Sequence, residues 1–523
     1  MSEPLPAEMP GHDSQAEVIA HLSDPASHGA CVDQVERIDT HGAMVFLAGE
    51  WAYKIKRAVK FAYMDFSTLE KRHRMCLREL EINSRTAPKI YNGVVAITRE
   101  PDGRLRIDGI GTPVEWAILM CRFDQYALLA RIADRGGVDD ELIRKLAEVV
   151  SHFHAHAEPV YTADGQARMA AIVNELASAF AGAPDLVAHQ AAEAFAQQAM
   201  IHLRDVGECL SMRTHHGDVR RCHGDLHLNN IVMISGQPVL FDAIEFSDDI
   251  ATIDILYDLA FLIMDLDQRG HRPQANLLLN RYLYHSGSEW DLSGLAALPL
   301  FLSCRAGIRA MVTMQRAHQL DRTTAAPLLA DAKRYFEHAR AYLQPEDPQL
   351  VAIGGFSGSG KSTLAAALAP LMGTAPGAIH LRSDLERKAM FAVAETHRLT
   401  AEHYTPDASR QVYQRLLDKA KILLESGRTV IVDAVHSTGD ERKAVHQVAQ
   451  NLGLTFRGVW LTTEPGELRH RVDARIGDAS DATSQVVDMQ IARGTGPMTW
   501  SVINAGGNVE QTLAAARREL ALD

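Results

Sequence analysis

The stretch that decides the fold of the second half of the chain is Gly355-Phe356-Ser357-Gly358-Ser359-Gly360-Lys361-Ser362. It fits G-x-x-x-x-G-K-[ST], with an apolar run at 350–353 before it and a helical pattern at 363–368 after it. Glycines let such a loop curl its N–H groups around phosphate oxygens, the lysine reaches the outer phosphates, and the last hydroxyl ligates Mg²⁺. The stretch therefore predicts a site for ATP and Mg²⁺, with Ser362 on the metal and nucleotide contacts at Gly355, Ser357, Gly358, Ser359, Gly360, Lys361, Ser362 and Thr363.

Strand and helix patterns alternate around this loop. Helices are expected to begin near Lys361, Ser409, Arg442 and Val509. Strands are expected at 350–353, 378–381, 429–432, 458–461 and 501–504. Such alternation is typical of a doubly wound, mainly parallel sheet flanked by helices, which we expect over residues 350–523.

Two acids follow the second and third of these strands. Asp384 lies in Arg382-Ser-Asp-Leu-Glu-Arg387, and Asp433 comes directly after 429–432. Open α/β sheets gather their ligands at the carboxyl ends of the strands. These motifs resemble those of the small-substrate P-loop kinases, a group that includes gluconate kinase, polynucleotide kinase and zeta toxins. The resemblance covers most of residues 350–523 and implies that Asp384 takes the proton of the acceptor hydroxyl, Arg387 holds substrate or phosphate, and Asp433 supports the metal.

Arginines follow the fourth strand of this half. Arg469, Arg471 and Arg475 lie on an expected helix, and the polar stretch 477–483 comes after them. A lid of this kind lays arginines on the transferring phosphate, whereas the same spacing is also typical of a solvated helix face. The family resemblance favours Arg471 and Arg475 as catalytic residues.

A second set of phosphotransfer residues lies in the first half. His223-Gly-Asp-Leu-His-Leu-Asn-Asn230 precedes an apolar run, and a second apolar run at 239–241 leads into Asp242. Asp225 is suited to accept a hydroxyl proton, while Asn230 and Asp242, brought together by the intervening hairpin, offer oxygen ligands to Mg²⁺. The sequence therefore predicts a second catalytic site.

These residues resemble the aminoglycoside and choline kinase family, whose H-G-D-x-x-x-x-N and later Asp match at Asp225, Asn230 and Asp242. The resemblance covers roughly residues 30–340 and implies a bilobal fold like that of protein kinases. It also implies that Lys54, in Ala52-Tyr-Lys54, faces the nucleotide, with Lys56 as the alternative. A glutamate on the next helix should pair with this lysine; Glu79 is the first choice and Glu81 the second.

The rest of the first half agrees with two lobes. A hairpin is expected at 44–56, turning at Gly49-Glu50, and further strands at 94–98 and 114–120. From Asp139 the pattern is largely helical through Tyr342, apart from a region around 222–246. We therefore expect an N-terminal extension at 1–29, a small lobe at about 30–124, a large lobe at about 125–342, a linker at 343–349 containing Pro345 and Pro348, and the P-loop domain at 350–523.

Composition excludes several classes of protein. With 523 residues, 46% of them hydrophobic and 23% charged, the chain has the composition of a multidomain globular protein rather than a disordered one. Its net charge of −13 disfavours an extended nucleic acid as partner. The six cysteines include no C-x-x-C, and no secretory signal or uninterrupted apolar run of ~18 residues is present. We therefore predict a cytoplasmic location, no membrane segment and no obligate protein partner.

Together these features predict an α/β and α+β two-domain fusion that uses ATP and Mg²⁺ to phosphorylate hydroxyl groups of small molecules at two sites. Two alternatives remain. In the first, the P-loop half is the single kinase and the first half is a regulatory or binding module. In the second, the chain is a zeta-toxin-like kinase of nucleotide sugars. The toxin alternative is disfavoured because such a chain normally needs a neutralising partner, which nothing in the sequence indicates.

Overall fold

The computed structural model describes residues 15–61, 63–184, 186–318, 320–475 and 477–522. The chain forms two compact units. Unit 1 comprises the chain up to Gly137 with His156–Val160 and Arg220–Ile253, and unit 2 comprises Val138–Ala155, Tyr161–Val219 and Asp254–Asp523. This division differs from the predicted domains, whose boundaries stay a prediction. The predicted extension at 1–29 lies partly outside the described residues; its described part contains α1 (Ala16–Ser23) and the short helix η1 (Pro25–His28).

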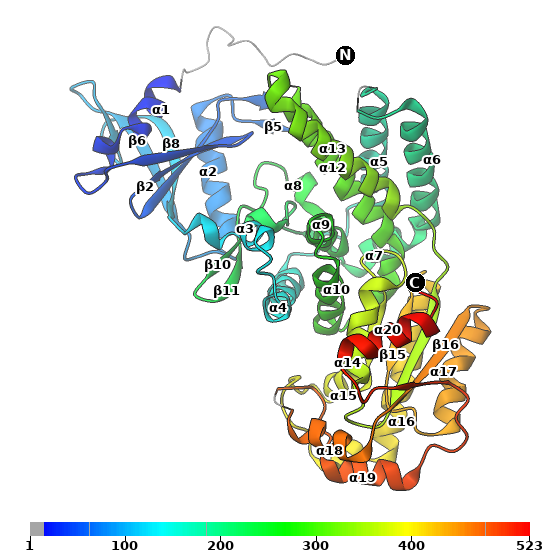
Figure 1. Ribbon diagram of the computed structural model, residues 1–523. Coiled ribbons are helices and arrows are strands. Elements are labelled where there is room, and N and C mark those ends of the chain that lie inside the picture. Colours follow the sequence, from blue (N-terminus) through cyan, green and yellow to red (C-terminus); the bar gives the residue numbers. More distant parts are fainter. Residues whose placement is uncertain (1–14, 62, 185, 319, 476, 523) are drawn as a thin grey trace. The chain divides into compact units, whose positions relative to one another are not determined.

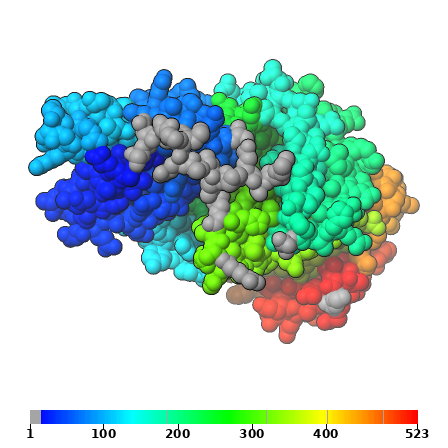
Figure 2. All heavy atoms as spheres, turned by 90° about the horizontal axis from the view of Figure 1, so that it is seen from above, coloured from blue at the N-terminus to red at the C-terminus, as the bar shows by residue number. Residues whose placement is uncertain are grey.

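Unit 1 is built on an antiparallel sheet of six strands in the order β1-β2-β3-β8-β6-β7 (Figure 1). The strands are β1 (Val35–Asp39), β2 (Ala43–Ala48), β3 (Trp51–Lys56), β6 (Tyr91–Arg99), β7 (Leu105–Ile107) and β8 (Thr112–Cys121). The β2-β3 hairpin turns at Gly49-Glu50, as predicted, and Gly49 supplies the positive φ of 60°. Helix α2 (Leu69–Asn83) begins at the cap Thr68 and packs against the sheet through Cys76 and Leu80. In the space-filling view these elements are coloured blue to light blue (Figure 2).

The remaining elements of unit 1 carry the residues predicted to be catalytic. The helical turn η3 (Leu228–Asn230) runs directly into β10 (Ile231–Ile234), which pairs antiparallel with β11 (Gln237–Leu240). Asn230 and Asp242 therefore lie at the same end of one hairpin, which confirms the predicted strand, turn and strand. The other short elements are β4 (Lys60–Phe61), β5 (Met64–Asp65), η2 (Gln125–Ala127), α3 (Leu129–Asp134) and α8 (Asp248–Ala251). The chain passes between the units at β9 (Val219–Arg221) and β12 (Thr252–Asp254).

The first part of unit 2 is helical, as predicted. Its core helix is α9 (Ile255–Gln268), in which every residue from Ile255 to Leu266 is buried. Asp254 caps it by accepting a hydrogen bond from the Leu256 N–H at 2.8 Å. The stretch Glu289–Ala317 is long and apolar enough to cross a membrane, but most of it is buried inside the protein. The other helices are α4 (Asp140–His156), α5 (Gly165–Ala181), α6 (His189–Asp205), α7 (Gly207–His216), α10 (Arg272–Ser286), α11 (Glu289–Gly294), η4 (Leu295–Ala297), α12 (Leu298–Ala317) and α13 (Arg322–Tyr342).

The second part of unit 2 contains a parallel sheet of five strands in the order β14-β15-β13-β16-β17. Helices cover both faces of the central strand, so Leu350–Ile353 are fully buried. The doubly wound fold is therefore confirmed. The strands are β13 (Gln349–Gly355), β14 (Ile379–Arg382), β15 (Val430–Asp433), β16 (Thr455–Thr462) and β17 (Ser501–Asn504); the helices are α14 (Lys361–Leu368), η5 (Ala369–Leu371), α15 (Ser383–Met390), η6 (Ala401–Tyr404), α16 (Pro406–Glu425), α17 (Gly439–Asn451), α18 (Pro465–Asp473), α19 (Ser484–Arg493) and α20 (Val509–Glu519).

Candidate active sites

The phosphate loop, as we call residues 355–362, joins β13 to α14, and its glycines determine its shape. Gly355 has φ 149°, and a Cβ there would lie 2.5 Å from Ser359 Oγ. Gly358 has φ 87°, and a Cβ there would lie 2.5 Å from the Leu468 carbonyl oxygen. No other residue type fits at either position without a shift of the backbone or its neighbours. The loop therefore curls tightly onto the N-terminus of α14, where N–H groups and the helix dipole favour an anion.

The polar groups of this loop fit a magnesium nucleotide. Ser359 Oγ is buried and has no hydrogen-bond partner among the described residues. Lys361 Nζ donates to the Phe356 carbonyl at 3.1 Å. Burial lowers the pKa of Lys361, against the opposing effect of the Asp433 and Asp384 carboxylates. A bound phosphate would supply the negative charge that this half-buried ammonium needs, and hydroxyl and carboxylate oxygens at Ser362 and Asp433 are the ligand type that Mg²⁺ prefers.

A cavity of about 600 Å³ opens over the loop and brings several predicted residues together. Asp384, Arg471 and Arg475 line it with loop residues 357–363. Burial raises the pKa of Asp384, although a hydrogen bond with Ser480 partly offsets the effect. Both arginines are held in place: Arg471 donates to the Ala505 carbonyl at 3.0 Å, and Arg475 Nε lies 3.9 Å from Asp478 Oδ2. The cavity therefore combines a phosphate cradle, a half-buried acid and two cations.

Two predicted residues lie beside this cavity rather than in its lining. Asp433, the last residue of β15, has its Oδ2 3.3 Å from His380 Nε2 and 3.8 Å from Arg382 Nε. Burial alone would raise the pKa of Asp433, but the hydrogen bond from His380 and the positive charges of Lys361 and Arg382 hold it below its usual range. Asp433 is therefore ionised at neutral pH, as a metal ligand must be.

Arg387 lies outside the cavity lining and contacts residues of η6. Its guanidinium donates to the His403 carbonyl at 2.8 Å and lies 4.7 Å from the centre of the Tyr404 ring. Arg387 is nearly buried by these neighbours. The structure thus gives it a local structural contact, and its role in holding substrate stays a prediction.

The structure adds cavity residues that the sequence did not single out. Asp478, Ser480 and Asn508 line the cavity, and Asp478 accepts a hydrogen bond from Arg382 at 3.1 Å. The polar stretch after α18 was the available signal for Asp478 and Ser480. Asn508 is the cap of α20 and accepts from the Gln511 N–H at 2.8 Å, so the start of that helix was the signal for its position.

In unit 1, two buried lysines share one carboxylate. Lys54 Nζ lies 2.8 Å from Glu79 Oε1 and also pairs with Asp242. Lys56 pairs with the other oxygen of Glu79 and with Glu245. Burial would raise the pKa of Glu79, but the two ammonium groups lower it to about 2. The predicted Lys54–Glu79 pair is therefore present; Glu81, the alternative, instead forms an exposed pair with Arg78. The contact of Lys54 and Glu79 with nucleotide stays a prediction.

The catalytic loop brings Asp225 and Asn230 into contact. The Asn230 amide donates to Asp225 Oδ2 and to the Asp225 carbonyl, both at 2.9 Å. The ring of His223 links the loop to the next strand, with Nε2 2.9 Å from the Phe241 carbonyl. The structure therefore brings Lys54, Glu79, Asp225, Asn230 and Asp242 together within unit 1.

The segment that carries Asp242 is fixed by α2 and β6. Asn83, buried at the end of α2, accepts from the Ala243 N–H at 2.8 Å. The Tyr91 hydroxyl accepts from the Asp242 N–H at 3.2 Å. Asp242 itself has φ 61°, a conformation that costs a non-glycine residue about 1–3 kcal/mol and persists only where neighbours impose it. These contacts hold the carboxylate against Lys54.

Replacing Lys56 with methionine should destabilise unit 1, because Glu245 would stay buried without its counter-charge. Breaking one partner of a buried ion pair costs about 3–5 kcal/mol. We expect a lower urea midpoint, followed by tryptophan fluorescence, and a partial recovery when Glu245→Gln is added. Lys60→Met, at an exposed position, is the control. A Lys56→Met chain that unfolds at the wild-type midpoint would show that the pair does not stabilise the unit.

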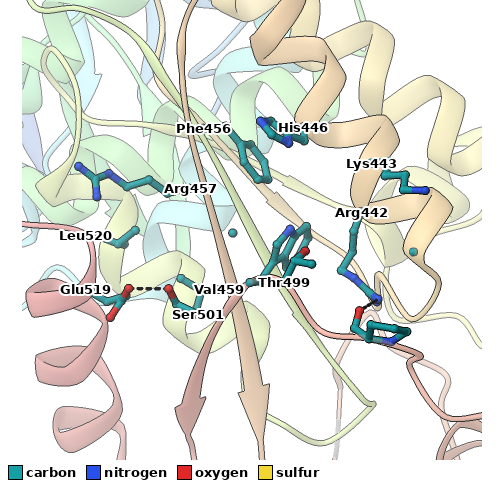
Figure 3. Close-up of a pocket in the computed structure, with 14 residues that line it drawn as sticks. Arg442, Lys443, His446, Phe456, Arg457, Val459, Thr499, Ser501, Glu519 and Leu520 are labelled. Carbon is teal, nitrogen blue, oxygen red and sulfur yellow. Dashed lines mark hydrogen bonds between the residues drawn. The ribbon is translucent and has the colours of Figure 1, made fainter.

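A second cavity of about 670 Å³ lies beside the first half of β16 (Figure 3). Basic and aromatic side chains line it, but Arg442 already donates to the Pro497 carbonyl at 2.9 Å, and the acid Glu519 accepts from Ser501 at 2.5 Å. The phosphate loop lies instead at the carboxyl ends of the strands. This cavity therefore lacks the combination of loop and acid that phosphoryl transfer needs.

Comparison with known proteins identifies both parts. Residues 124–298 match the model of a phosphotransferase enzyme family, and residues 350–497 match that of an AAA domain. Uncharacterised proteins of Mycobacterium tuberculosis (strain H37Rv) and Mycobacterium bovis are 28% identical over 509 residues, 95% of this chain and 98% of theirs.

Similar solved structures include a gluconokinase from Sinorhizobium meliloti 1021, at 19% identity and TM-score 0.26, over 34% of this chain and 93% of that one. A choline/ethanolamine kinase family protein from Mesorhizobium loti matches at 14% identity and TM-score 0.37, over 62% and 98%. At these values the two structures support no argument about this chain.

The family matches contain both sets of motif residues. The phosphotransferase match includes Asp225, Asn230 and Asp242, and the AAA match includes the phosphate loop, Asp384 and Asp433. Both point to phosphoryl transfer of the kinase type. The chain therefore joins a segment that matches the phosphotransferase enzyme family, at residues 124–298, to a segment that matches an AAA domain, at residues 350–497.

Proposed function

We propose that the second half is an ATP- and Mg²⁺-dependent kinase that transfers the γ-phosphate to a hydroxyl group of a small molecule. The observation that carries the proposal is the single cavity in which the phosphate loop, Asp384, Arg471 and Arg475 meet. A cavity of about 600 Å³ is in the range of small-molecule sites.

The residues divide the work of the reaction between them. The loop N–H groups and Lys361 hold the phosphates in line with the acceptor, which is most of what a phosphoryl transfer enzyme does. Bound Mg²⁺, held by Ser362 and Asp433, would neutralise the phosphate charge. Asp384 accepts the hydroxyl proton as the oxygen attacks, and its raised pKa makes it a stronger base than an exposed aspartate. Arg471 and Arg475 stabilise the charge on the transferring group.

The same proposal extends to unit 1, which makes the chain bifunctional. Lys54, held by Glu79, would orient the ATP phosphates; Asn230 and Asp242 would hold Mg²⁺; and Asp225 would accept the proton of a second acceptor. The proposed partners are small molecules only. No disulfide joins the six cysteines, all of which lie among the described residues, and this suits the reducing cytoplasm in which we place the protein.

One observation bears on the alternative in which the first half regulates the second. Helix α10 contacts the edge strand β14 of the parallel sheet, with Asn280 Oδ1 accepting from the His380 N–H at 2.7 Å. A structural link of this kind is compatible with either reading, because a catalytic domain is also able to support its neighbour. Activity of the first half decides between them.

The acid limb of the pH–rate profile tests the role of Asp384. The assay uses the full chain with Asp225→Asn and an acceptor found by screening sugars, aminoglycosides, nucleosides and sugar acids. Asp384 works only when ionised, so activity should be lost as pH falls through its raised pKa, above the ordinary aspartate value of about 3.9. Asp384→Asn should lower turnover by ~10²-fold or more, with ATP affinity nearly unchanged and the limb removed. If the activity of the Asp384→Asn chain still falls at acid pH as in the parent chain, a group other than Asp384 accepts the hydroxyl proton.

A further inference from the structure

The parallel sheet of unit 2 ends at strand β14, and helix α10 of the same unit lies against that edge. The Asn276 amide donates to the Ala378 carbonyl at 3.0 Å, and the Asn280 amide donates to the same carbonyl at 3.3 Å. Asn280 Oδ1 in turn accepts from the His380 N–H at 2.7 Å. Edge strands present unpaired backbone groups, so these side chains replace the hydrogen bonds of a missing strand.

Helix α10 lies close to the sheet edge, and a separate ion pair from the same helix makes a second contact. Gly377 has φ 132°, and a Cβ there would lie 2.8 Å from Asn276 Nδ2. Arg281, on the same helix, forms an ion pair of 2.5 Å with Glu395, and 8% and 23% of the two side chains are exposed. Because this pair is largely shielded from water, it is screened less than a surface pair. Helix α10 therefore contacts this part of unit 2 at two places, the edge of β14 and Glu395.

The contact continues to the phosphate-loop site through one side chain. The same His380 whose N–H binds Asn280 places its buried ring against Asp433, with Nε2 and Oδ2 3.3 Å apart. The Asp433 carboxylate is close enough to Lys361 to influence its charge. A continuous series of hydrogen bonds thus runs from α10 through the backbone and ring of His380 to the acid beside the phosphate loop.

We propose that His380 is a positioning residue for Asp433, and that α10 holds His380 in place through Asn280. The inference rests on the proposed function of Asp433 as a support of Mg²⁺. Groups that bind a ligating carboxylate fix its orientation, and their removal typically costs 10–100-fold in metal affinity or activity. The helical part of unit 2 then sets the geometry of the phosphate-loop site whether or not the first half is itself a catalyst.

The test compares nucleotide binding with and without the metal. A non-hydrolysable ATP analogue is titrated calorimetrically into the full chain in Mg²⁺ and in EDTA, and the phosphate-loop component is the one that Lys361→Ala removes. His380→Leu should weaken this component by about 10-fold or more in Mg²⁺ and leave it unchanged in EDTA. His380→Gln, which keeps an N–H donor, should recover most of the affinity.

The contact with α10 is tested in the same assay. Asn280→Ala should weaken the component in Mg²⁺ in the same direction as His380→Leu, because it frees the backbone of His380. Gln274→Ala, six residues earlier on the same helix, is the matched control and should bind as the wild type does. Wild-type affinity in EDTA shows that a variant has kept its fold.

The outcomes separate this inference from the proposed function. If His380→Leu binds as tightly as wild type in Mg²⁺, or loses affinity equally in Mg²⁺ and EDTA, His380 does not position a metal ligand and the inference is wrong. If Asn280→Ala alone behaves as wild type, the role of α10 is wrong. If the wild-type chain has no component that Lys361→Ala removes, the proposed function fails, and the inference with it.

Discussion

Lys361→Ala should remove nucleotide binding at the phosphate loop, so that the full chain binds one ATP analogue instead of two. Lys361 lies in the loop, where its amine donates to the Phe356 carbonyl, and the motif implies that it reaches the outer phosphates of a bound nucleotide. Hydrogen bonds to charged groups contribute about 1.5–3 kcal/mol each. The loss of several phosphate contacts therefore lowers affinity by about 10²-fold or more.

Calorimetric stoichiometry measures this loss. Lys443→Ala is the matched control, because that lysine is exposed on α17 and lines the other cavity; it should leave two sites. A Lys361→Ala chain that keeps both binding events at wild-type affinity would mean that residues 355–362 do not form the nucleotide site.

Asp225→Asn should abolish phosphoryl transfer in unit 1 while leaving its ATP affinity nearly unchanged. Loss of a positioned base typically costs 10²–10⁴-fold in rate. Asparagine keeps the size of the side chain and an oxygen that accepts from Asn230, which now donates to Asp225 Oδ2 at 2.9 Å. The expected loss is therefore one of turnover and not of fold. Unchanged turnover in this variant would mean that Asp225 is not the base.

Local sequence patterns predicted the strands of the parallel sheet and the helices around it well. Helix caps explain why two of these helices begin earlier than expected. The helices expected near Lys361 and Val509 begin at those residues. The helix expected near Arg442 begins earlier, at Gly439, because Thr438 and Glu441 form a capping box. The helix expected near Ser409 begins at Pro406 after the cap Thr405, a position that proline favours.

Site residues could be predicted where they lie close together in the sequence within one motif, or on one face of a single helix or strand. Lys54 and Glu79 were predictable from the strand and the helix that follows it. Lys56 and Glu245 are 189 positions apart, and no local pattern connects them. His380 reads as part of an ordinary strand, and its hydrogen bond to Asn280 spans 100 positions. Arg387 was singled out by its motif, but the motif does not show that its guanidinium donates to the His403 carbonyl.

Acceptor-stimulated ATP consumption shows whether the chain has two independent phosphotransfer sites. The assay compares the wild-type chain, Lys361→Ala, and Lys361→Ala combined with Asp225→Asn, over a broad panel of acceptors. We expect at least one acceptor still to stimulate ATP consumption by the Lys361→Ala chain. Adding Asp225→Asn should abolish this stimulation. If no acceptor stimulates the Lys361→Ala chain, while changes in residues 1–342 alter the activity of the P-loop half, the first half is a regulatory module and the account of two sites is contradicted.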